Sequence, residues 1–183
     1  QESFDIYADD FDNNKSTDIV LGYYYDGEQY PLRGRQCSSE QIPAIEIKFK
    51  DYNSFAEADL ADVYSTQSLE NALHYRAYTF ASSYLENLGG GKFKMNPLPN
   101  EAQFSSINSI LSKDVNADGY LDLIVSGNLY TSEVETPRND ASYGLYLEGD
   151  GHGAFNPMSA TKSGLYVKGD VKNSAWIKLS NTT

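Results

Sequence analysis

Cysteine and histidine are scarce in this chain of 183 residues. The single cysteine, Cys37, excludes an intramolecular disulfide and any zinc site built from cysteines. The two histidines, His74 and His152, lie far apart in the sequence and have no ligand-like spacing. A disulfide framework and a zinc centre of this kind are therefore not expected.

Positive charge and long apolar runs are also scarce. The chain has 14 Lys and Arg residues against 26 Asp and Glu residues, a formal net charge of −12. Nucleic acid and anionic membranes both need a basic face, so neither is predicted as the main partner. No stretch approaches the roughly 18–20 apolar residues of a membrane span. The acidic balance suits a chain that collects cations, although a merely solvated acidic surface would give the same totals.

Recognisable catalytic motifs are missing, since neither G-x-S-x-G nor H-E-x-x-H occurs. The run "GGGK" at 89–92 lacks the first glycine and the following Ser or Thr of a phosphate loop, so it is interpreted as a hairpin turn. His152 lies in the similar turn "GDGHGAF" and is interpreted as exposed rather than catalytic. We expect a non-catalytic protein. A pair of glycosidase carboxylates is the alternative, because sequence spacing does not reveal such a pair.

An acidic motif is present in more than one copy. The stretch "DVNADGYLDLIV" (114–125) aligns with "DFDNNKSTDIVL" (10–21), and both run into apolar residues typical of strands. A third, degraded copy begins at Asp170, where Lys172 takes the third position. The spacings agree with a unit of about 56 residues if the first copy carries an insertion at 26–75. Within this insertion we predict a loop and then two short helices, with a capping box at Ser54 and Glu57.

A second element recurs as "YLENLGGGKF" (84–93) and "YLEGDGHGAF" (146–155). Each copy combines a strand, a glycine-rich turn and a returning aromatic residue, which predicts a β-hairpin. Short strands with glycine turns, repeated every 40 to 60 residues, are typical of propeller blades. The sequence therefore predicts a mainly β chain. Its expected architecture is a partial β-propeller of about two to three blades, in which 1–183 is a segment of one domain with a small helical insertion at 26–75.

The acidic loops have the ligand spacing of a calcium site. Calcium takes six to eight oxygen ligands, and a loop with oxygens at positions 1, 3, 5, 7 (carbonyl) and 9 can wrap around it. An EF-hand is excluded because position 12 of the second copy is Val125 instead of glutamate and a strand follows. Magnesium fits less well, and an ion-free Asx-rich turn is the other alternative. The first copy is predicted to be weaker, since Asn14 replaces a carboxylate and Lys15 takes the glycine position. The copy at Asp170 is expected to be empty.

The loop pattern, with the downstream G-x-G-x-F hairpin, resembles the FG-GAP/VCBS repeat, the calcium-binding blade of integrin-α-like propellers. From "FASSYLENLGGGKF" to "SGLYVKGDV" the chain is similar to secreted VCBS-repeat proteins of Bacteroidetes bacteria, which are related in their repeats to cartilage acidic protein. The resemblance implies calcium, a toroidal propeller and an extracellular or cell-surface location. It assigns calcium-ligand roles to Asp10, Asp12, Asn14, Ser16 (carbonyl), Asp18, Asp114, Asn116, Asp118, Tyr120 (carbonyl) and Asp122.

A binding role is the function expected for such a module. Fifteen tyrosines supply flat amphipathic surface for protein or glycan partners, although any one of them can equally pack between strands. The insertion at 26–75 is the favoured place for partner contact. The remaining blades are expected to come from a longer chain or from another subunit. We therefore predict a calcium-binding adhesion or binding scaffold, with a carbohydrate-active enzyme or its accessory glycan-binding domain as the alternative.

Overall fold

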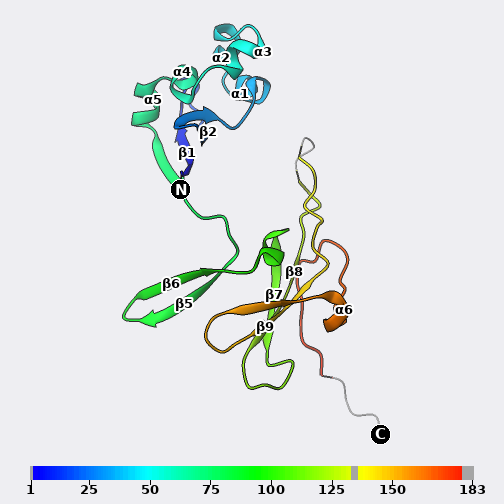
Figure 1. Ribbon diagram of the computed structural model, residues 1–183. Coiled ribbons are helices and arrows are strands. Elements are labelled where there is room, and N and C mark those ends of the chain that lie inside the picture. The colour runs from blue at the N-terminus through cyan, green and yellow to red at the C-terminus, as the bar shows by residue number, and fades with distance from the viewer. Residues whose placement is uncertain (1, 133–135, 179–183) are drawn as a thin grey trace. The chain divides into compact units, whose positions relative to one another are not determined.

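The computed structural model describes residues 2–132 and 136–178. The chain divides into two compact units, Gln1–Phe80 and Ala81–Thr183, and each is described by itself. Both units are built around antiparallel strands (Figure 1). The predicted mainly β class is confirmed.

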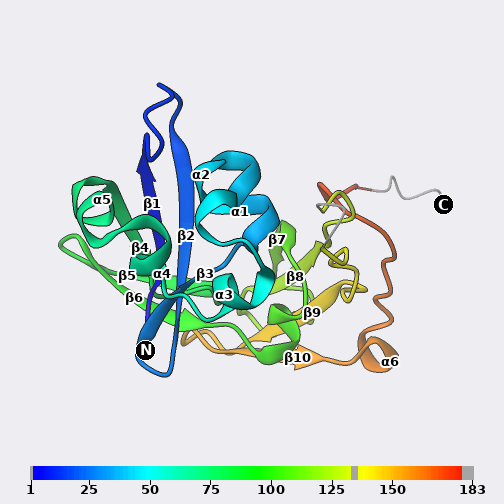
Figure 2. The ribbon, with the colours of Figure 1, turned by 90° about the horizontal axis from the view of Figure 1, so that it is seen from above.

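The first unit contains a four-stranded antiparallel sheet with the order β3-β2-β1-β4. Its strands are β1 (Phe4–Asp9), β2 (Asp18–Tyr25), β3 (Glu28–Pro31) and β4 (Leu73–Ala77). Alternate residues of β1 and β2, including Tyr7 and Val20, are buried, which is the pattern of strands with one covered face. Figure 2 shows β1 and β2 side by side, with the short helices of this unit beside them.

The predicted loop after residue 25 is wrong at its start. Asp26 and Gly27 have positive φ angles of 52° and 84°, and they join β2 to β3 as a two-residue hairpin turn. Asp-Gly is a favoured dipeptide for this turn, because both positions need left-handed backbone. The turn places Tyr30 opposite Tyr23 in the sheet, so the segment 26–75 begins with a strand.

The rest of that segment is more helical than predicted. Five short helices replace the expected two, and they are α1 (Arg35–Gln41), α2 (Ala44–Lys48), α3 (Tyr52–Ala56), α4 (Leu60–Tyr64) and α5 (Thr66–Asn71). The capping box at Ser54 and Glu57 is also wrong. Ser54 lies inside α3, and its backbone N–H donates to the carboxylate of the N-cap residue Asp51 at 2.8 Å. The capping box forms at Asp59 and Asp62 instead.

Helices this short are marginal in isolation, so tertiary packing must hold them. One cluster joins buried residues of the helical segment: Ile42, Ile45, Phe49, Phe55, Ala58 and Val63. A second cluster joins Tyr7 and Val20 of the sheet to Leu60 of α4. The helical segment therefore supplies the apolar cover of the sheet in this unit.

The second unit contains a sheet with the order β10-β9-β8-β7 and a separate hairpin of β5 and β6. Its strands are β5 (Ser83–Gly89), β6 (Lys92–Pro97), β7 (Ile107–Lys113), β8 (Asp122–Gly127), β9 (Leu145–Gly149) and β10 (Phe155–Met158). The 3-10 helix η1 (Asn100–Gln103) and the helix α6 (Ala160–Ser163) complete the unit. Both predicted glycine-turn hairpins, β5–β6 and β9–β10, are confirmed. The core packs Ala102, Val125 and Leu147 together.

The sheets of the described residues are open, and each has two edge strands. Residues 165–178, where the degraded third copy lies, contain no helix or strand. In the described part of the chain, no helix is both long and apolar enough to cross a membrane.

Candidate metal-binding loops

The two complete copies of the acidic motif occupy equivalent places in the two units. The first loop (residues 10–18) joins β1 to β2, and the second loop (residues 114–122) joins β7 to β8. Both strand pairs are antiparallel, and their last paired residues are Asp9 with Asp18 and Lys113 with Asp122. Each loop therefore closes a hairpin, and position 9 of the loop is the first residue of the returning strand.

The loops share one set of backbone-to-side-chain hydrogen bonds. In both, the N–H groups of positions 5 and 6 donate to the carboxylate at position 1, Asp10 or Asp114, at 2.8–3.2 Å. The N–H of position 5 also reaches the side-chain oxygen at position 3, and the N–H of position 7 reaches that at position 5. The N–H of position 2 donates to the carboxylate at position 9, Asp18 or Asp122. The side-chain oxygens thus converge on the inside of each loop.

The backbone follows the same path in both loops. Positions 4 and 6 have positive φ angles: 59° at Asn13 and 71° at Lys15, against 63° at Ala117 and 93° at Gly119. Lys15 thus adopts left-handed backbone at the position that glycine takes in the second loop. A non-glycine residue in this region costs about 1 kcal/mol, so the first loop stores strain that Gly119 avoids in the second.

Positions 3 and 5 exchange their chemistry between the loops. The first loop has Asp12 and Asn14 there, and the Asn14 amide donates to Asp12 Oδ2 at 3.1 Å. The second loop has Asn116 and Asp118, and the Asn116 amide donates to Asp118 Oδ2 at 2.8 Å. Each loop therefore keeps three carboxylates and one amide. The asparagine at position 14 does not by itself make the first loop poorer in charge.

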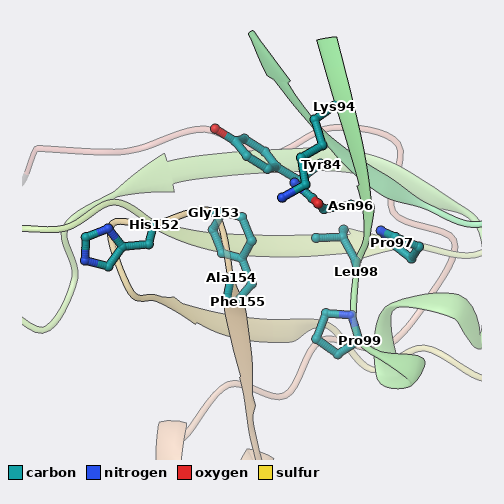
Figure 3. Close-up of a pocket in the computed structure, with 10 residues that line it drawn as sticks. All are labelled: Tyr84, Lys94, Asn96, Pro97, Leu98, Pro99, His152, Gly153, Ala154 and Phe155. Carbon is teal, nitrogen blue, oxygen red and sulfur yellow. The ribbon is translucent and has the colours of Figure 1, made fainter. Parts of the chain in front are cut away.

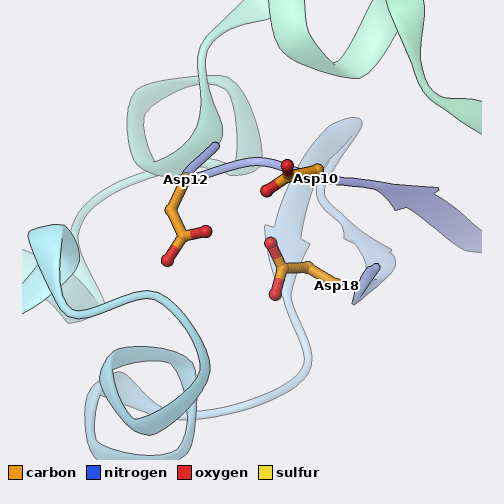
Figure 4. Close-up of side chains that lie close together, drawn as sticks. All are labelled: Asp10, Asp12 and Asp18. Carbon is orange, nitrogen blue, oxygen red and sulfur yellow. The ribbon is translucent and has the colours of Figure 1, made fainter. Parts of the chain in front are cut away.

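The three carboxylates come closest together in the first loop. Asp10, Asp12 and Asp18 each place an oxygen within 4.8 Å of the others, and their side chains point toward one another (Figure 4). Within residues 2–132 and 136–178, no other group of three or more Asp, Glu, His or Cys side chains places its ligand atoms this close together. The carboxylates of the second loop do not converge to the same degree. The loop predicted to be weaker thus has the tighter cluster.

The two position 9 carboxylates differ in what surrounds them. Asp122 is fully buried and accepts from Gly149 N at 3.0 Å, from Val115 N at 2.9 Å and from the Tyr146 hydroxyl at 2.8 Å. Burial would raise the pKa of Asp122, but these donors outweigh it and hold the pKa below its usual range. In turn, burial and the neighbouring Asp122 raise the pKa of Tyr146 to about 12. Asp122 is thus satisfied by the protein itself.

Asp18 is buried with fewer donors. Its carboxylate accepts from Phe11 N at 3.0 Å, and no second donor to it is found among the described residues. Burial raises the pKa of Asp18, and the negative charges of Asp12 and Asp10 raise it further. A cation between these carboxylates would offset the repulsion from Asp12 and Asp10.

Several partners of the loops were not predicted. Glu148 of β9 accepts from the Asn116 amide at 2.8 Å and brings a fourth carboxylate to the second loop. Gln41 of α1 lies beside the first loop, where its side chain accepts from Ile19 N and donates to Ile19 O, both at 3.3 Å. In the second unit the equivalent residue, Leu123, pairs with Leu147 of β9. In the first unit, one side chain of the helical segment thus takes the place beside Ile19 that strand β9 takes beside Leu123 in the second unit.

The degraded copy is arranged differently. Lys172 Nζ lies 2.6 Å from Asp170 Oδ1, and Asp170 Oδ2 accepts from Tyr130 N at 3.2 Å. Lys172 thus supplies a positive charge to Asp170, the carboxylate equivalent to Asp10 and Asp114 in the other two loops. The lysine holds the pKa of Asp170 below its usual range.

Outside the loops, the first unit contains a buried acid that sequence reasoning missed. Asp5 of β1 is completely buried and contacts His74 Nε2, and it accepts from Arg76 Nε at 3.1 Å. Burial acts against its ionisation, but Ser3, His74 and Arg76 together lower the pKa of Asp5. The register of β1 against β4 brings these side chains together, and sequence spacing alone does not show that register.

Searches of the chain against family models, curated proteins and solved structures found no match. What the two loops can bind therefore follows from their own geometry. That geometry offers hard oxygen ligands on a preformed loop, which suits a cation such as calcium.

Proposed function

We propose that the chain is a calcium-binding module in which each of the two acidic loops holds one Ca²⁺ ion. The single observation that carries this proposal is the shared hydrogen-bond set of the two loops, in two separate units and with two different sequences. It rests on ten ligand positions within residues 10–18 and 114–122, namely eight side chains and the backbone carbonyls of Ser16 and Tyr120. Calcium prefers such oxygen ligands and tolerates irregular geometry.

The role of the ion is structural in this proposal. Three carboxylates within 4.8 Å repel one another unless a cation neutralises them. Binding to the folded loop alone adds stability of RT ln(1 + [Ca²⁺]/Kd). Extracellular calcium modules have Kd values of about 10⁻⁴–10⁻³ M, so millimolar calcium would contribute about 1 kcal/mol for each loop.

The wider function we propose is that of an extracellular or cell-surface binding scaffold. The motif's resemblance to FG-GAP/VCBS blades, the repeated hairpins and the open antiparallel sheets support a partial propeller of this kind. Exposed aromatic residues such as Tyr75, Tyr78 and Phe80 offer surface for protein or glycan partners. A carbohydrate-active enzyme or its accessory domain is the second candidate, and the observation in its favour is Glu148, which adds a carboxylate beside the second loop.

Calcium titration by calorimetry, combined with thermal unfolding in calcium and in chelator, tests the proposal. We expect two binding events. When a chelator removes the calcium, the melting temperature of each unit should fall by about 4–8 °C. Asp12→Ala should abolish one event and Asp118→Ala the other. Glu57→Ala, at an exposed acid outside both loops, is the matched control and should keep both. A wild-type chain with no heat of binding and no chelator effect would refute the proposal.

A further inference from the structure

Two adjoining cavities lie in the second unit, next to the second loop. One has a volume of about 370 Å³ and the other about 350 Å³, and both are lined by Tyr84, Gly153, Ala154 and Phe155. Tyr120 of the second loop lines the larger cavity. Small-molecule sites commonly have volumes of about 300–1,000 Å³, so the pair together has the size of such a site.

The aromatic walls of these cavities are fixed by glycine. A Cβ atom at Gly151 would lie 2.2 Å from the Tyr120 ring, and one at Gly153 would lie 3.2 Å from the Tyr84 ring. Both rings thus rest directly on the backbone of the β9–β10 turn. Tyr84 also meets Phe155 edge to face, with ring centroids 5.5 Å apart. These contacts hold flat apolar surfaces in place before any ligand arrives.

Polar groups border the same walls. Asn96 stands opposite Tyr84 in the β5–β6 hairpin, and Lys94 stands opposite Glu86. Figure 3 shows Lys94 and Asn96 close to Tyr84, with His152 at the other end of the smaller cavity. The side chains of Tyr84, Lys94 and Asn96 make no hydrogen bond to another described residue. Donors and acceptors are therefore available next to apolar ring faces.

We propose that a neutral disaccharide, or the end of a longer neutral glycan, binds across the two cavities. One sugar ring lies against Tyr120 and the next against Tyr84 and Phe155, since the C–H faces of a pyranose suit aromatic rings. The hydroxyl groups meet Lys94, Asn96 and His152. The net charge of −12 disfavours an anionic glycan. Two cavities of similar volume favour two consecutive rings over one large aromatic ligand.

The proposed glycan site is linked to the second loop. Tyr120 is position 7 of that loop, so its backbone belongs to the proposed calcium site while its side chain forms the cavity wall. Calcium bound at this backbone would further stabilise the position of the ring against Gly151. Thermodynamic linkage then requires that glycan and calcium strengthen each other's binding. This inference rests on the proposed calcium-binding function.

The test uses the full chain and three probes, cellobiose, lactose and maltose, in saturation-transfer NMR and calorimetry. At least one disaccharide should bind with a Kd between about 10⁻⁵ and 10⁻³ M. Tyr120→Ala should weaken it about tenfold, and Ser112→Gln, which fills the larger cavity from β7, should weaken it as well. Tyr25→Ala removes an exposed tyrosine of the first unit and should change nothing.

The outcomes separate this inference from the calcium proposal. Calcium binding without binding of any of the three disaccharides overturns the glycan site alone. The same holds if p-cresol, a mimic of a tyrosine side chain, binds in their place. Equal losses in Tyr25→Ala and Tyr120→Ala would also overturn it, and one-dimensional NMR spectra check that both variants fold. Disaccharide binding that is unchanged by chelator removes the linkage to the loop.

Discussion

The first and second loops have the same backbone and the same internal hydrogen bonds, but they balance their charge differently. In the second unit Val115 of the loop, together with Tyr146 and Gly149 of β9, supplies three donors to the buried carboxylate of Asp122. In the first unit Asp18 receives its hydrogen bond from Phe11 and lies beside two further carboxylates. Protein donors therefore satisfy the buried carboxylate of the second loop, whereas the first loop has closely spaced carboxylates whose repulsion a cation would offset.

The largest expected effect separates these two roles. Asp122→Asn should destabilise the second unit by about 2–3 kcal/mol with or without calcium, because an amide group must then face a buried donor. Asp18→Asn retains one acceptor oxygen for Phe11 N and removes a repelled charge. Without calcium it should leave the first unit as stable as wild type or more so, and with calcium it should abolish the added stability.

Hydrogen exchange resolved by peptide, in calcium and in chelator, measures both units in one experiment. Protection of β1–β2 reports on Asp18→Asn, and protection of β7–β8 reports on Asp122→Asn. Equal behaviour of the two variants would remove the distinction between the loops.

A smaller effect is expected from position 6. Lys15→Gly should relieve about 1 kcal/mol of backbone strain at a φ of 71°. It also removes a positive charge near the carboxylates, so calcium should bind the first loop about threefold more tightly. The exchange Gly119→Lys should act in the opposite direction in the second loop. Calcium titration checks both, and Asn13→Gly, at another left-handed position without charge, should leave the affinity unchanged.

The smallest effect concerns pH in the absence of calcium. The pKa of Asp18 is raised, so its unfavourable contribution is present above that pKa and disappears as the pH falls through it. The pKa values of Asp122 and Asp5 are lowered, so their stabilising contributions are complete above the ordinary aspartate pKa and are lost as the pH falls from there through the lowered values. Mild acidification in chelator should thus increase protection of β1–β2 relative to β7–β8. Asp18→Asn should abolish this trend, and a trend of opposite sign would contradict the assignment.

Local patterns in the sequence predicted what depends on local chemistry. The spacing of Asp114 to Asp122, the left-handed Lys15 and the two glycine-turn hairpins all follow from residues close together in the chain. The Asp26-Gly27 dipeptide also carries a local signal for a hairpin turn, although the predicted structure at this position is a loop.

Contacts between distant residues decided the rest. Tyr146 is 24 residues from Asp122, Glu148 is 32 residues from Asn116, and Gln41 is 22 residues from Ile19. The sheet register determines these contacts, and the sequence pattern does not reveal that register. The relative strength of the loops was predicted from residue types alone. Which carboxylate oxygens already had donors was not visible in the sequence.

The carboxamide of Gln41 also matters for solubility. An unpaired strand edge offers N–H and C=O groups on which another chain can grow a sheet. Beside the first loop, the Gln41 side chain hydrogen-bonds to both main-chain groups of Ile19. Because Gln41 belongs to helix α1, it offers no strand edge on which sheet pairing could continue. Gln41 therefore protects the edge of β2 from pairing with another chain at the point where β2 extends past the end of β3.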